Sequence, residues 1–159
     1  MSHTPKFVPP GVGGVLIGPG GDQLVAKISA AETGDRFSFT ECTVPPQSGP
    51  PLHVHEREDE AFWILAGEVA FWVNDAKITA PAGSFVYGPR GVPHTFRNLS
   101  TTPARMLLLV TPARNFEAFY EKIGGRRADG SAPADAEIVE RIMRFAPEHG
   151  IRVLGPNPL

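Results

Sequence analysis

Three histidines and one glutamate in this chain have the types and the spacing that a metal site requires. His53 and His55 lie two positions apart in an apolar segment, so an extended strand would point both imidazoles to one face of a sheet. Neutral imidazole binds several divalent metals at about 2.0–2.1 Å. Glu60 follows a charged turn, and a cation would offset the free energy that a buried carboxylate without a partner costs. With His94 as the fourth candidate ligand, the sequence predicts a site for one divalent metal ion.

A turn must bring His94 to the other three side chains. Pro89, Arg90 and Gly91 are typical turn residues, because proline presets φ and glycine adopts positive φ without strain. This turn would reverse the chain so that His94 begins a new strand. We expect the amide of Asn98 to brace the same turn.

Alternation along the strands predicts which neighbours of the ligands face the metal. Phe62, Ile64 and Phe96 share the inward direction of the ligands, and we expect them to line the substrate pocket. Each is also a common core residue type. Trp63 has the opposite parity and should point away from the cavity. Solvated positions without a chemical role are expected at residues 56–59, His3 and His149.

The elements that position these residues are short strands. Seventeen glycines and seventeen prolines separate brief apolar segments, which is typical of a sandwich or barrel with many turns. We expect strands at residues 14–17, 23–29, 36–44, 52–55, 61–65, 69–73, 76–79, 84–87, 94–98 and 105–110. This number of strands predicts an all-β fold, an antiparallel jelly-roll β-barrel.

The last third of the chain changes to helical periodicity. Phe116, Phe119, Tyr120 and Ile123 follow the i, i+3, i+4, i+7 pattern after a predicted cap at Thr111. A second helix is expected over about residues 134–146, so a C-terminal pair of α-helices should pack on the barrel. We therefore predict a single domain over residues 1–159. Its parts are an extended arm at 1–14, the barrel at 15–110 and a helical tail at 111–159.

Composition restricts the partners. The net charge is −2 without a run of like charges, so we expect no nucleic acid partner. Apolar runs are too short for a membrane-spanning helix, so no membrane partner is expected. The N-terminus lacks the apolar segment of a secretory signal, and the lone Cys42 cannot form an internal disulfide. We expect a cytoplasmic protein that binds a small molecule, with Cys42 as a small strand residue.

Two blocks of this sequence resemble the two motifs of the cupin superfamily. The blocks are His53-x-His55-x4-Glu60-x6-Gly67 and Gly83-x5-Pro89-x-Gly91-x2-His94-x3-Asn98. Gln47 stands where the first family motif begins with glycine. The chain is similar in length and order of elements to small single-domain cupins, and its ligand set resembles that of bacterial quercetinases of the quercetin 2,3-dioxygenase type.

The resemblance implies a metal-dependent dioxygenase that acts on a small enolic or phenolic, flavonol-like substrate. His53, His55 and His94 would bind the ion, and Glu60 would be both ligand and catalytic base. The ion would be Fe, Mn, Ni, Co, Cu or Zn. Two alternatives remain open: a cupin that uses the metal as a Lewis acid without oxygen, as an isomerase, decarboxylase or hydrolase, and a non-catalytic small-molecule-binding cupin. The resemblance also implies a homodimer.

Overall fold

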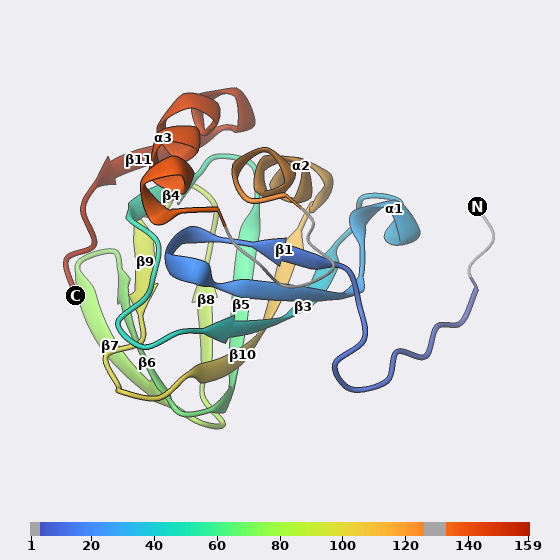
Figure 1. Ribbon diagram of the computed structural model, residues 1–159, viewed down its shortest axis with the longest axis horizontal. Coiled ribbons are helices and arrows are strands. Elements are labelled where there is room, and N and C mark those ends of the chain that lie inside the picture. The colour runs from blue at the N-terminus through green and yellow to red at the C-terminus, as the bar shows by residue number, and fades with distance from the viewer. Residues whose placement is uncertain (1–3, 126–132) are drawn as a thin grey trace.

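Two antiparallel sheets face each other in the computed structural model, which describes residues 4–125 and 133–159 (Figure 1). The six-stranded sheet contains, in spatial order, β1 (Val15–Ile17), β2 (Gln23–Ile28), β3 (Ser38–Val44), β10 (Ala104–Thr111), β5 (Asp59–Ala66) and β8 (Phe85–Gly88). The five-stranded sheet contains β11 (Ile151–Gly155), β4 (Leu52–His55), β9 (His94–Arg97), β6 (Glu68–Val73) and β7 (Ala76–Pro81). This arrangement is a jelly-roll sandwich, and it confirms the predicted fold class.

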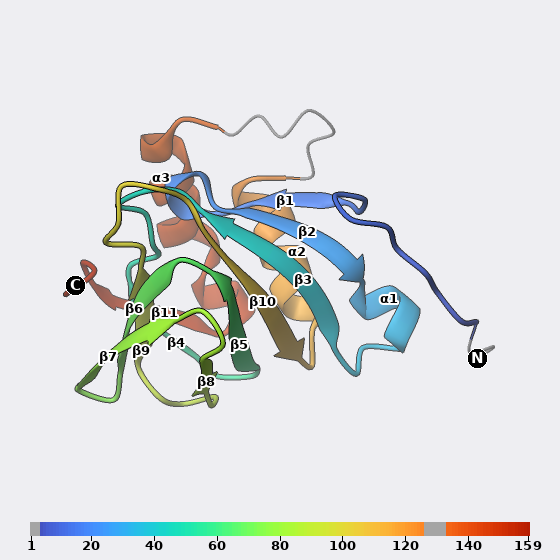
Figure 2. The ribbon, with the colours of Figure 1, turned by 90° about the horizontal axis from the view of Figure 1, so that it is seen from below.

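Alternating burial explains why the strands form where they do. In β3 every second residue is buried, and Cys42 is one of these, as expected for a small strand residue. Strand β10 repeats the alternation and pairs with β3 from Ala104 opposite Val44 to Val110 opposite Ser38. Figure 2 shows β2, β3 and β10 side by side. The buried side chains of both sheets meet in one core, because each sheet turns its apolar face inward.

Three helices accompany the sheets. They are α1 (Ala30–Thr33), α2 (Arg114–Ile123) and α3 (Asp135–Phe145), and the 3-10 helices are η1 (Pro19–Gly21) and η2 (Pro147–His149). The predicted C-terminal pair is therefore present as α2 and α3. The predicted cap at Thr111 is wrong, since Thr111 is the last residue of β10 and its hydroxyl donates to the carbonyl of Arg36 at 2.6 Å. The helix begins later, at Arg114.

The two long helices pack over β1 and β11. Apolar residues from all four elements form a second buried cluster, which comprises Ile17, Phe119, Ile123, Ile138, Ile142, Ala146 and Ile151. Strand β11 was not predicted: the tail expected to be helical also contributes this edge strand beside β4. Its first residue continues the apolar surface of α3, so the tail closes one side of the sandwich.

Trp63 lies on the outer surface of the six-stranded sheet. Trp63 is 48% exposed, which agrees with its predicted outward direction, and Phe85 and Tyr87 of the neighbouring strand are also exposed. Residues 4–14 contain no helix or strand and run away from the sheets (Figure 2). His3 lies outside the described residues. None of the helices described is both long and apolar enough to cross a membrane.

Candidate metal centre

Three strands carry the four predicted ligands. His53 and His55 lie on β4 and are separated by Val54, so their side chains project to the same side of the sheet. His94 begins β9 and pairs directly with His53 across the sheet. Glu60 is the second residue of β5 in the opposite sheet. The turn predicted at residues 56–59 occupies residues 56–58, since Asp59 already begins β5, and it lets Glu60 face the histidines.

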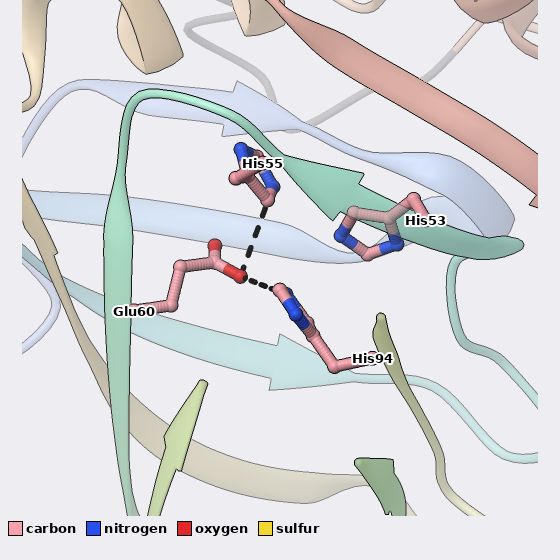
Figure 3. A group of neighbouring side chains, drawn as sticks. All are labelled: His53, His55, Glu60 and His94. Carbon is pink, nitrogen blue, oxygen red and sulfur yellow. Dashed lines mark hydrogen bonds and ion pairs between the residues drawn. The ribbon is translucent and has the colours of Figure 1, made fainter. Parts of the chain in front are cut away.

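The four side chains converge between the sheets (Figure 3). One ligand atom from each lies within 4.8 Å of all the others. The Nε2 atom of His94 is 2.8 Å from Glu60 Oε2, and Nε2 of His55 is 3.8 Å from the same oxygen. Bonds of about 2.0–2.2 Å to a common ion would place donor atoms up to ~4.4 Å apart. The residues therefore fit a metal ion after only a small contraction.

Outer hydrogen bonds orient two of the imidazoles. The Nδ1 atom of His53 lies 2.8 Å from the carbonyl oxygen of Pro51, and Nδ1 of His94 lies 2.8 Å from that of Val92. A carbonyl oxygen only accepts, so each Nδ1 must donate its proton. In the neutral imidazole this leaves the lone pair on Nε2, the atom that faces the centre.

Comparison with known proteins agrees with this geometry. Residues 40–110 match the Cupin domain family, and this span contains all four ligand residues. The segment 40–110 is therefore similar to the cupin superfamily, and the fold of the chain agrees with this similarity. The solved structure of KdgF from Halomonas sp. has a TM-score of 0.63 to this chain at 16% identity, and the match covers 72% of this chain and 99% of that one.

Two curated relatives of this chain have names that indicate different functions. The chain is 24% identical to quercetin 2,3-dioxygenase of Bacillus subtilis over 139 residues, which are 86% of this chain and 41% of that protein. It is 32% identical to an oxalate-binding protein of Thermotoga maritima over 72 residues, 45% of this chain and 60% of that protein. The chain thus covers less than two thirds of the length of either relative.

The charges at the centre favour a cation. Burial raises the pKa of Glu60, but the charge of His55 and the hydrogen bond from His94 outweigh burial and lower the pKa to about 2. Burial lowers the pKa of His94, but the hydrogen bond to Glu60 prevails and raises it. Burial, followed by the charges of His94 and His55, lowers the pKa of His53 to about 3. The carboxylate is therefore ionised, and the place between it and the imidazoles suits a positively charged ion.

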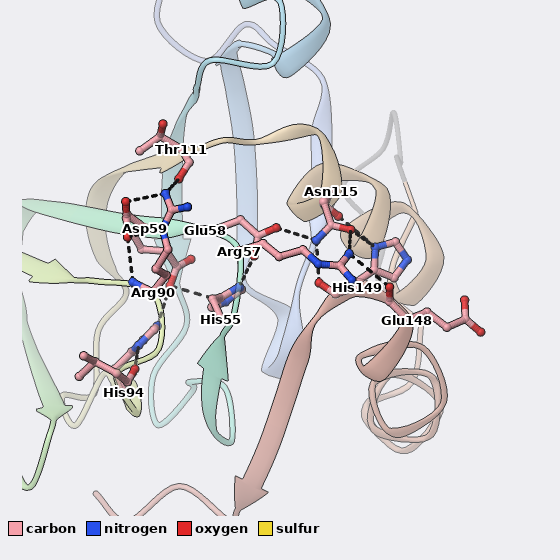
Figure 4. Close-up of polar contacts among 12 residues, drawn as sticks. His55, Arg57, Glu58, Asp59, Arg90, His94, Thr111, Asn115, Glu148 and His149 are labelled. Atoms are coloured by element: carbon pink, nitrogen blue, oxygen red, sulfur yellow. Dashed lines mark hydrogen bonds and ion pairs between the residues drawn. The ribbon is translucent and has the colours of Figure 1, made fainter.

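A fully buried glutamate, Glu58, supports His55 from outside. Its Oε2 atom lies 3.3 Å from Nδ1 of His55, and its Oε1 atom accepts from Asn115 Nδ2 at 2.6 Å (Figure 4). Asn115 belongs to α2 and also donates to the carbonyl of His149 at 2.7 Å. The predictions that Glu58 and His149 are solvated are wrong, because α2 and the start of β11 cover the turn. Glu58 and Asn115 are functional candidates that the sequence analysis missed.

Removal of this outer acceptor is expected to weaken metal binding. Exchange Glu58→Leu should lower the affinity for Co2+ by about 10–100-fold, because the His55 ring loses the partner that fixes its orientation. Exchange Glu58→Gln keeps an acceptor oxygen and should retain most of the affinity. Calorimetric titration of metal-stripped protein measures both. Equal affinities of Glu58→Leu and wild type, with both proteins folded by circular dichroism, would contradict the supporting role.

The hydrogen bonds that hold the turn before His94 come from other residues than the predicted Asn98. Arg90 donates from its backbone to Asp59 at 2.8 Å, and Gly91 donates to the carbonyl of His55 at 2.7 Å. Asn98 does not brace this turn, because it lies past the other end of β9. Its amide instead donates to Val44 and Thr102, at 3.0 and 2.8 Å.

Gln47 adopts the conformation that its family counterpart, a glycine, favours. Its φ is +58°, in the left-handed region that non-glycine residues rarely enter. The side-chain amide donates to the carbonyl of Leu99 at 2.8 Å, and the backbone N–H of Gln47 donates to Asn98 at 2.8 Å. These bonds hold the turn at Gln47 in this left-handed conformation.

A cavity of about 40 Å³ opens beside the ligands. Its wall is mostly apolar and includes Leu24, Cys42, Phe96, Met106, Leu108, Phe119, Tyr120, Ile142, Ile151 and Val153. Of the three residues predicted to line the pocket, Phe96 does so. Phe62 and Ile64 have the predicted inward direction but lie elsewhere in the core, where the Phe62 ring contacts Phe71 and Phe96. Asp22 also lines the cavity and was not predicted.

Proposed function

We propose that this protein is a metal-dependent dioxygenase that acts on a small enolic or phenolic substrate. The observation that carries the proposal is the convergence of His53, His55, Glu60 and His94 beside an apolar cavity. A bound divalent ion would supply Lewis acidity toward substrate oxygens and, if redox-active, a route for electrons to dioxygen. Four protein ligands leave up to two octahedral positions open. The similarity to quercetin 2,3-dioxygenase of Bacillus subtilis supports the oxygen-dependent reaction.

The residues of the site would have different roles in this reaction. The three imidazoles would hold the ion, since their outer nitrogens are hydrogen-bonded to other groups. Glu60 is ionised and would accept the hydroxyl proton of the substrate, which would leave the substrate as an enolate. Apolar neighbours such as Phe96 and Leu108 would exclude water from the enolate. Both atoms of one dioxygen molecule would enter the product.

Oxygen consumption tests the proposal. Protein loaded with Fe2+, Mn2+, Ni2+ or Co2+ is mixed anaerobically with a panel of flavonols, β-diketones and catechols, and a shift in substrate absorption is expected. Admission of air should then consume oxygen in wild type but not in Glu60→Ala. The exchange Glu68→Ala at an exposed position of β6 is the matched control and should retain the activity. Absence of oxygen uptake with every substrate and metal would refute the dioxygenase proposal.

A second function is favoured by the size of the cavity. About 40 Å³ is far below the ~300 Å³ or more of pockets that enclose drug-sized ligands, so a flavonol enters only if the covering helices move. A smaller substrate suits a Lewis-acid reaction without oxygen, and product formation under strict anaerobiosis would identify it. The similarity to the oxalate-binding protein of Thermotoga maritima supports the non-catalytic alternative. Tight binding of a ligand without product under any metal loading would identify that alternative.

We also propose that the protein forms a homodimer through the outer face of β5 and β8. Trp63, Phe85 and Tyr87 expose large apolar side chains there, with Trp63 directly opposite Phe85. Light scattering at micromolar concentration is expected to return twice the mass of the chain, and Trp63→Glu should shift the equilibrium toward monomer. A wild-type monomer under the same conditions would refute the dimer.

A further inference from the structure

Asp22 is a second polar feature of the cavity wall. It follows η1, is 2% exposed, and is the one acidic residue outside the ligand set among the described residues that line the cavity. Most of the remaining wall is apolar, and an unpartnered polar group in such a wall is costly. The hydrogen bonds of this buried carboxyl group therefore determine what it can bind in the cavity.

The hydroxyl of Ser48 forms a hydrogen bond with one carboxyl oxygen of Asp22. The Oγ atom lies 2.9 Å from Asp22 Oδ1, 3.1 Å from the carbonyl of Gly20 and 3.4 Å from that of Pro19. A hydroxyl has one proton to donate. If Asp22 is ionised, Ser48 donates to Oδ1. If Asp22 is protonated on Oδ1, the acid donates to Ser48, which then donates to Gly20.

When Asp22 is ionised or protonated on Oδ1, its other oxygen, Oδ2, is left as an acceptor. As a carboxylate oxygen or as the carbonyl oxygen of the acid, it has lone pairs and no proton. Among the described residues, Ser48 is the one side chain that hydrogen-bonds the Asp22 carboxyl group. Burial raises the pKa of Asp22 to about 7, against the smaller opposing effect of the Ser48 bond, so both states are populated near neutral pH.

We propose that Asp22 anchors the end of the substrate that lies away from the metal, by accepting a hydrogen bond from a substrate hydroxyl on Oδ2. This inference rests on the proposed function, because it takes the other end of the substrate to be bound at the ligand cluster. The substrate class is then a small molecule with a chelating pair of oxygens at one end, a hydroxyl at the other and an apolar middle.

The volume of the cavity limits the length of such a molecule. About 40 Å³ holds roughly three water molecules at ~10–15 Å³ each. A substrate of a few non-hydrogen atoms therefore suits the closed cavity. A longer molecule would extend beyond this cavity.

Hydroxamates provide a direct test, because they chelate divalent metals through two oxygens and are small. Acetohydroxamate is compared with glycolohydroxamate, and propanohydroxamate with 3-hydroxypropanohydroxamate. Each pair differs by one terminal hydroxyl. Calorimetric titration of Zn2+-loaded wild type is expected to give about tenfold tighter binding of the hydroxylated member in at least one pair, the size of one buried hydrogen bond.

Variants of Asp22 separate the anchor from a merely structural acid. The ratio of the two dissociation constants in a pair is the readout, so a general loss of affinity cancels. The ratio should fall to within about twofold of unity in Asp22→Leu, and in Asp22→Ala if the leucine variant does not fold. It should be retained in Asp22→Asn, because an amide can donate to Ser48 and present its oxygen to the cavity.

The outcomes distinguish the anchor from the proposed function. Equal binding within both pairs in wild type, or an undiminished ratio in Asp22→Leu and Asp22→Ala, overturns the anchor and leaves the metal centre standing. Failure of every hydroxamate to bind Zn2+-loaded wild type overturns the anchor together with the proposed substrate-binding function of the centre.

Discussion

Exchange Glu60→Gln is expected to lower the affinity of the protein for Co2+ by more than about 100-fold, a larger loss than removal of an outer hydrogen-bond partner causes. The reason is electrostatic. Glu60 is the one carboxylate of the ligand cluster, and it is 5% exposed among three imidazoles. A neutral amide leaves the incoming dication without an anion in a buried, poorly solvated place. Titration of metal-stripped protein, followed by the visible absorption of Co2+, measures the affinity.

The same exchange at Glu68 provides the matched control. Glu68 begins β6 and is exposed, so Glu68→Gln should bind Co2+ as wild type does. Circular dichroism of both apo variants checks that each is folded. Binding of Co2+ by Glu60→Gln within about threefold of wild type would contradict the assignment of Glu60 as a ligand.

Exchange Asp22→Asn is expected to stabilise the protein increasingly as the pH rises. In the folded protein burial raises the pKa of Asp22 from its ordinary value of 3.8 to about 7. An acid whose pKa is raised on folding costs nothing below pH 4, where both folded and unfolded chains hold the proton. The folded protein loses stability as the pH rises from about 4 to about 7, and no more is lost above that. The loss is on the order of 4 kcal/mol.

Urea unfolding between pH 4.5 and 8.5 measures this effect as a difference between two proteins. The free energy of unfolding of Asp22→Asn minus that of wild type should grow with pH and level off above about pH 7, because other titrating groups contribute equally to both. The exchange Asp75→Asn, in the exposed turn between β6 and β7, serves as control. A difference that is constant over this pH range would contradict a neutral buried Asp22.

Alternation and turn residues predicted much of the fold. All ten predicted strands have a counterpart, because their apolar residues alternate or are bounded by glycine and proline. The convergence of the four candidate ligands could also be predicted, since each has a local signal: a period of two for His53 and His55, and a turn before Glu60 and before His94. These signals act over a few residues and need no knowledge of the packing.

The missed features depend on contacts between distant segments. Strand β11 has a short apolar run, and only its pairing with β4 and its contact with α3 identify it. Glu58 was interpreted as part of a solvated turn, although its spacing of three from His55 offered a weak signal. Its burial comes from α2, which lies more than fifty residues later in the chain. Asp22 was missed for the same reason, because its partner Ser48 lies in another loop.

X-ray absorption spectroscopy of the Zn2+-loaded protein tests the central claim most directly, because it reports the atoms bound to the ion. We expect nitrogen and oxygen neighbours at about 2.0–2.2 Å, with the outer-shell scattering of three imidazoles in wild type and of two in His94→Ala. A sulfur neighbour at about 2.3 Å, or fewer than three imidazoles in wild type, would contradict the metal centre proposed for His53, His55, Glu60 and His94.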